Sequence, residues 1–107
     1  MTIGFRMFRD DVLVALHPES TEGQLAELVN SKSVEVRVAL AERPYALATL
    51  VGDKDVRVLV AVASGQETPP ELLAKLALHP EVEVRKAVHK NKSATEEIRV
   101  QAALLGV

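Results

Sequence analysis

The residues best suited to bind a charged partner form a basic segment in the last quarter of the chain. Its members are Arg85, Lys86, His89, Lys90 and Lys92. On a helix the first four lie at positions i, i+1, i+4 and i+5, so they predict one continuous basic stripe opposite an apolar face. Such a stripe is suited to an acidic protein or to phosphate groups. The alternative is a solvated helix face whose charge is offset by Glu81 and Glu83.

Catalytic chemistry finds little support in the sequence. The chain has no cysteine, and its three histidines, His17, His79 and His89, are far apart. This excludes a thiol nucleophile and a cysteine-ligated metal, and it argues against a histidine metal site. We therefore expect no enzyme activity, no cofactor and no catalytic or metal-binding residues.

A short apolar pattern recurs four times along the chain. It consists of Val, two variable residues, Ala, and then Leu or Val. The copies are Val12/Ala15/Leu16, Val36/Ala39/Leu40, Val58/Ala61/Val62 and Val84/Ala87/Val88, on average 24 residues apart. Because positions i, i+3 and i+4 lie on one face of a helix, each copy predicts a short helix. We call the first residue of each copy its repeat valine.

A second apolar pattern lies at a constant distance before three of these copies. The pairs Leu25/Leu28, Leu47/Leu50 and Leu73/Leu76 each begin 11 residues before a repeat valine. The segments between them contain residues that favour turns. The constant spacing predicts a helix–turn–helix unit that is repeated along the chain.

The expected helices cover approximately residues 9–16, 22–30, 34–42, 46–51, 55–64, 69–78, 82–90 and 95–105. The β-branched segment 56–62 has the weakest helical signal, but its register with the sister segments favours a helix. Capping boxes are expected where Thr or Ser precedes Glu or Gln by three residues. These pairs are Thr21 with Gln24, Thr68 with Glu71, and Ser93 with Glu96.

Residues 10–105 resemble the leucine-rich repeat variant, a HEAT-like bacterial repeat of about 24 residues. The resemblance rests on the segments 53–56 and 68–77 and on the Val-Arg pairs at 36–37 and 84–85. It implies a right-handed solenoid of alternating helices, a protein-binding role and a bacterial or phage origin. The arginine after the repeat valine is replaced by Leu13 and Leu59, so a continuous arginine ladder is not expected.

Arg37 and Arg85 share the position after a repeat valine, so the two side chains are expected to project on one side. They are candidates for a joint partner site. The alternative is that each forms an ion pair with an acidic residue of a neighbouring repeat. The acidic residues available are Asp53, Asp55 and Glu83.

Both ends of the chain are apolar. The first residues include Phe5 and Phe8, and the last include Leu104 and Leu105. Two interpretations remain open: the ends fold as lids over the terminal repeats, or an exposed end associates with a second copy.

Together these observations predict an all-α protein, residues 1–107, built as one α-α superhelix of about three to four two-helix repeats of 24 residues. We expect it to bind a partner protein through a solenoid face or an apolar terminus. The candidate partner-binding residues are Arg37, Arg85, Lys86, His89, Lys90 and Lys92. Nucleic-acid binding and self-assembly are the alternatives; the net charge of −2 and the three aromatic residues argue against nucleic acid. No membrane span is expected, and a cytoplasmic location follows from that.

Overall fold

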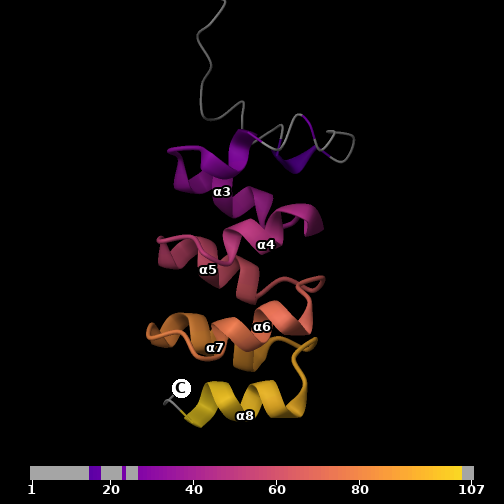
Figure 1. The fold of residues 1–107 in the computed structure, drawn as a ribbon, viewed down its shortest axis with the longest axis vertical. Helices are drawn as coiled ribbons and strands as arrows, with labels where there is room; N and C mark the ends of the chain where they lie inside the picture. Colours follow the sequence, from indigo (N-terminus) through magenta and orange to yellow (C-terminus); the bar gives the residue numbers. More distant parts are fainter. Residues whose placement is uncertain (1–14, 18–22, 24–26, 105–107) are drawn as a thin grey trace, which may run out of the picture.

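The computed structural model describes residues 15–17, 23 and 27–104, and within this part of the chain it contains helices and no strand (Figure 1). The elements, in chain order, are the 3₁₀ helix η1 (Glu27–Asn30), α3 (Val34–Leu40), the 3₁₀ helix η2 (Pro44–Ala46), α4 (Leu47–Leu50), α5 (Val56–Ala63), α6 (Pro70–Leu76), α7 (Val82–Lys90) and α8 (Glu96–Leu104). The predicted all-α class is confirmed. The β-branched segment is helix α5.

Polar side chains fix where the helices begin. The Ser33 hydroxyl accepts a hydrogen bond from the Val36 N–H, and the Asp55 carboxylate accepts one from the Arg57 N–H. Thr95 does the same for the Ile98 N–H at the start of α8. Each interaction satisfies one of the free N–H groups at a helix start, which explains why α3, α5 and α8 begin where they do.

Two of the predicted capping boxes are wrong. The Thr68 hydroxyl donates to the Val62 carbonyl at 2.7 Å, and Pro69 is the residue that precedes α6. The Ser93 hydroxyl donates to the Gln66 carbonyl at 2.9 Å, while Thr95 caps α8. The Thr68 hydroxyl therefore binds the last turn of α5, and the Ser93 hydroxyl binds the segment after it. Neither hydroxyl caps the helix that follows it. The third predicted box, Thr21 with Gln24, lies outside the described residues.

The two apolar patterns of the sequence form the core. The repeat valines Val36, Val58 and Val84 are fully buried. The leucines of the second pattern that the structure describes are buried as well: Leu28, Leu47, Leu50, Leu73 and Leu76. Of the first copy, Ala15 is buried whereas Leu16 is half exposed. Small alanines beside the valines allow neighbouring backbones to approach closely.

The helices that carry the repeat valines, α3, α5 and α7, are called the valine helices from here on. Each packs on the next: α3 contacts α5, and α5 contacts α7. Among the remaining helices, α6 contacts α8, and α7 contacts both α6 and α8. Figure 1 shows the helices following one another along the longest axis of the molecule. The principal extents are 55, 23 and 16 Å. The three valine helices are therefore in contact in the same order in which they occur in the sequence.

The turn before each valine helix has the same hydrogen bond. Ser31, Asp53 and His79 each lie five residues before a repeat valine. The side chain of each accepts the backbone N–H of the residue two positions later, at 3.1, 2.9 and 3.0 Å respectively. A hydroxyl, a carboxylate and an imidazole thus fill one structural position, because the turn requires only an acceptor there.

Two side chains, each just after a valine helix, bind backbone carbonyls at the end of the helix that carries the preceding copy of the valine pattern. The Arg43 Nε, after α3, donates to the Ala15 carbonyl at 2.9 Å, and its Nη2 donates to the His17 carbonyl. The Asn91 Nδ2, after α7, donates to the carbonyls of Ala63 at 2.7 Å and Gly65 at 2.8 Å. In both cases the acceptors lie 28 and 26 residues earlier in the chain. Each side chain satisfies carbonyls that a helix end leaves free.

Candidate interaction surface

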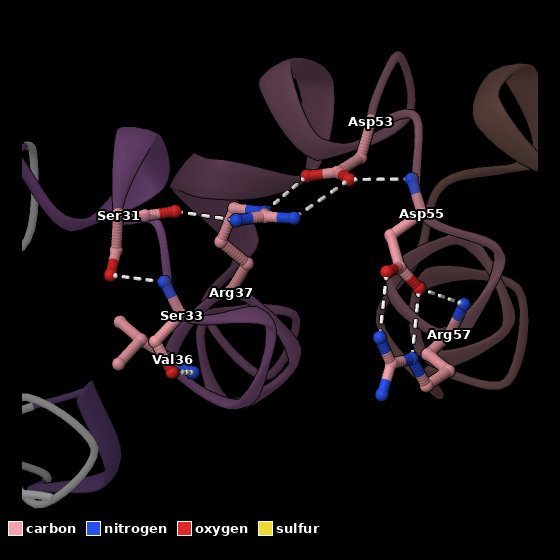
Figure 2. Close-up of polar contacts among 7 residues, drawn as sticks. All are labelled: Ser31, Ser33, Val36, Arg37, Asp53, Asp55 and Arg57. Carbon is pink, nitrogen blue, oxygen red and sulfur yellow. Dashed lines mark hydrogen bonds and ion pairs between the residues drawn. The ribbon is translucent and has the colours of Figure 1, made fainter. Parts of the chain in front are cut away.

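Arg37 is held by residues on two sides (Figure 2). Its Nε lies 2.7 Å from Asp53 Oδ2, and its Nη1 donates to the Ser31 carbonyl. Asp53 belongs to the turn before α5, so the ion pair joins the first valine helix to the second. Of the two alternatives, pairing with an acidic residue of the next repeat is therefore observed for Arg37.

Arg85 has a similar structural role. It is only 7% exposed, and its Nη1 donates to the carbonyls of His79 at 2.6 Å and Pro80 at 2.9 Å. Arg37 and Arg85 thus each bind the carbonyl of the residue six positions earlier, in the turn that precedes their own helix. The continuous basic stripe predicted from Arg85 onwards does not form, because the position after a repeat valine faces this turn and not solvent.

The other basic residues of the segment are on the surface. Lys86, His89, Lys90 and Lys92 are all exposed. Lys86 and Lys90 line a cavity of about 380 Å³ between α5 and α7. Its apolar wall is formed by Val60 and Ala87, and Glu83 and Asn91 complete the charged and polar part. Two ammonium groups beside an apolar wall are suited to a carboxylate on an apolar segment of another protein.

A second and larger cavity lies between α3 and α5. Its volume is about 570 Å³, and Val38, Ala41 and Leu47 are among its apolar lining residues. Glu42 and Glu67 provide its charged groups. Ser64 lines both cavities, so they are neighbours on the two sides of α5. We call the surface that contains them the valine-helix face; it has carboxylates at one end and lysines at the other.

Sequence reasoning missed the acidic end of this face. The signal was present in the spacing, because Glu42, Ser64 and Lys90 all lie six residues after a repeat valine, and Val38, Val60 and Lys86 lie two residues after one. Aligning the copies by these positions would have shown a surface whose charge changes sign along the helices.

Asp55 and Arg57 form a local ion pair at the start of α5 (Figure 2). Hydrogen bonds from the Arg57 side chain and then from its backbone N–H hold the pKa of Asp55 at about 2, below its ordinary value of 3.8. The carboxylate is therefore ionised throughout the neutral range, and its interactions are those of a helix cap.

The residues expected to associate at the chain ends are only partly described. Leu104, the last residue of α8, is 77% exposed, whereas Ala102 in the same helix is fully buried. Phe5, Phe8 and Leu105 lie outside the described residues. Val100 and Leu104 are the large apolar side chains that α8 leaves exposed, and single exposed apolar side chains are common on soluble proteins.

The described residues contain no group of three or more His, Cys, Asp or Glu side chains placed to hold a metal ion. Of the histidines, His79 has its Nδ1 hydrogen-bonded to the Glu81 N–H and serves the turn before α7. His17 and His89 are exposed. No helix of the described part is long and apolar enough to cross a lipid bilayer.

Comparisons of the chain with protein-family models, with curated proteins and with solved structures gave no match.

Proposed function

We propose that this chain is a short α-solenoid that acts by binding a partner protein through its valine-helix face. The solenoid is supported by the recurrence of the same contacts from one repeat to the next. Three turns share one acceptor position, two arginines share one carbonyl contact, and each valine helix packs on its sequence neighbour. Repeats that contact only their neighbours leave an extended lateral surface open for a ligand.

The observation that carries the binding role is the pair of adjoining cavities along α5. Half-buried Val38, Val60, Ala61 and Ala87 line them, with charged side chains around these apolar residues. An apolar centre with a polar rim is the usual composition of a protein-binding surface. The exposed lysines at one end favour a partner segment that carries carboxylates.

Site-specific crosslinking tests this proposal, because the chain contains no cysteine of its own. Ser64→Cys places a single thiol between the two cavities for a photoreactive maleimide. Lys75→Cys, at an exposed position of α6 that lines neither cavity, is the matched control. We expect the Ser64 probe to capture a defined protein from an extract of the source cells, and the Lys75 probe to leave it uncaptured.

Reversing the charge of two lysines then tests whether the partner binds at the valine-helix face. Lys86→Glu with Lys90→Glu should reduce the crosslinking yield at position 64 severalfold, since two favourable charges become repulsive. Lys32→Glu with Lys75→Glu changes the net charge equally at exposed positions outside both cavities and should have little effect. Identical captured proteins at positions 64 and 75, or equal losses in the two charge variants, would contradict the proposal. Capture of nucleic acid or of a second copy of this chain would assign the face to a different ligand.

A further inference from the structure

One position has the same structural role in two of the three described repeats and a different one in the third. Arg43, Gly65 and Asn91 all lie seven residues after a repeat valine. Arg43 and Asn91 reach across to the preceding layer and donate hydrogen bonds to carbonyls at its helix end. Gly65 has no side chain that could do this for α3. At the C-terminal ends of α3 and α5 the interface therefore lacks the hydrogen-bonding side chain that both neighbouring interfaces have, although Arg37 and Asp53 join the two helices elsewhere.

The larger cavity lies at this interface. Gly65 and Gln66 line it on the side of α5, and Ala41 and Glu42, at the end of α3, line it on the other side. In the neighbouring interfaces the corresponding region is crossed by a side chain that binds backbone carbonyls. Between α5 and α7 the equivalent residue, Asn91, lines the smaller cavity and supplies a polar side chain that the larger cavity does not have at Gly65.

Thr68 keeps this position free of a side chain. A Cβ atom on Gly65 would lie 2.6 Å from Thr68 Oγ1, closer than real contacts allow. Thr68 is 2% exposed and its hydroxyl is bonded to the Val62 carbonyl, so moving it would break a buried hydrogen bond. Any larger residue at position 65 would therefore displace a buried side chain, which disfavours a side chain on this wall of the cavity.

The charges of the cavity select a cation. Its described lining contains the carboxylates of Glu42 and Glu67 and no basic side chain. Arg43 is adjacent in sequence to Glu42, but its guanidinium binds Ala15 and His17 on the other side of α3. The carbonyls of the last three residues of α3 each accept one backbone N–H and keep a second acceptor position, so the helix end adds partial negative charge. The half-buried apolar side chains of Val38 and Ala61 provide contact for a methylene chain.

We propose that this cavity binds an arginine side chain of the partner protein, a specificity that rests on the proposed function. The guanidinium would occupy the end of α3 as Arg43 occupies the preceding helix end in this same protein. Its planar array of donors suits carbonyls and carboxylates together, which a lysine ammonium matches less well. The partner would then present an arginine to α3 and carboxylates to Lys86 and Lys90.

A titration with a capped amino acid tests the inference on the whole chain. The probe is N-acetyl-arginine N-methylamide, and the control is the citrulline analogue, which has nearly the same shape without the charge. Amide signals are followed by heteronuclear NMR. We expect arginine to shift the signals of Ser64, Gly65 and Gln66 in a saturable manner at millimolar concentrations, and citrulline to leave them unchanged.

Two double variants locate the effect. Glu42→Gln with Glu67→Gln should weaken arginine binding at least about twofold, since each exposed ion pair contributes a factor of about 1.4 to 5. Glu71→Gln with Glu97→Gln, at exposed positions that do not line the cavity, gives the same net charge and should bind as the parent chain does. Because all four side chains are exposed, the variants should keep the helical circular dichroism of the parent chain.

The inference is overturned if citrulline shifts the same signals as arginine, or if the two double variants lose binding equally. This outcome is distinct from failure of the proposed function. A face that crosslinks its partner in a lysine-dependent way but does not bind the arginine probe would retain the interaction surface and remove the arginine site.

Discussion

Arg37 and Asp53 form an ion pair between two successive valine helices, with 2.7 Å between Nε and Oδ2. Their side chains are only 16% and 10% exposed. The other oxygen of the same carboxylate accepts the Asp55 N–H at 2.9 Å (Figure 2). One acidic residue therefore both shapes the turn before α5 and connects that turn to α3.

Removing Arg37 should destabilise the protein more than removing an exposed lysine. We expect Arg37→Met to lower the free energy of unfolding by about 2 kcal/mol, because Asp53 and the Ser31 carbonyl both lose a charged donor. Lys54→Met, one residue after Asp53 and exposed, should change it by less than about 0.5 kcal/mol. Urea unfolding followed by circular dichroism measures both. Equal effects of the two substitutions would show that the ion pair contributes nothing.

Asn91 offers a test of the connection between α5 and α7. Asn91→Asp keeps the shape and the acceptor for the Ser93 N–H, but it replaces the donor that faces two carbonyls by a negative oxygen. We expect a loss of about 2 to 3 kcal/mol, since the residue is 7% exposed and the new charge would be repelled. Lys92→Ala at the next, exposed position is the control for thermal unfolding. A melting temperature unchanged by Asn91→Asp would contradict these hydrogen bonds.

The close approach of Gly65 and Thr68 predicts a non-additive pair of substitutions. Gly65→Ala should cost about 1 to 3 kcal/mol through its contact with Thr68 Oγ1. Thr68→Ala should cost a similar amount, because the Val62 carbonyl loses a buried donor. In the double variant the contact is absent, so its cost should be at least about 1 kcal/mol smaller than the sum. Strict additivity in a double-mutant cycle would show that the two positions do not compete for space.

Asp55 predicts a pH dependence of stability with a definite sign. Hydrogen bonds from Arg57 lower its pKa to about 2 in the folded chain, so between about pH 4 and pH 2 the unfolded chain binds more protons. The stability that the ionised Asp55 contributes to the folded chain is therefore complete above about pH 4 and is lost as the pH falls towards 2. Asp55→Asn removes this dependence. We expect the stability difference between the parent chain and the variant to shrink over this interval in urea titrations, and a constant difference would contradict the shift.

The core could be predicted from the sequence because it depends on spacing alone. The repeat valines and the leucine pairs fall on single helix faces, and the described members of both sets are buried. A helix was also predicted at 56–62 against its β-branched composition, because the register of the repeats outweighed local propensity.

The roles of the polar residues could not be predicted in the same way. Arg85 belongs to a basic segment in sequence, but its side chain turns back to the carbonyls of the preceding turn. Thr68 and Ser93 have the spacing of helix caps, but Thr68 bonds to the last turn of α5 and Ser93 to the segment after it. These contacts depend on distances between layers, which a one-dimensional pattern does not contain.

The side-chain connections of α5 to its two neighbours lie at opposite ends of the helix. The ion pair with α3 lies where α5 begins, and the hydrogen bonds from Asn91 lie where it ends. A bend between α3 and α5 would therefore pivot about Arg37 and Asp53 and alter the width of the cavity at the far end. We therefore expect a ligand in that cavity to change the angle between α3 and α5, which would couple its binding to the orientation of the two helices.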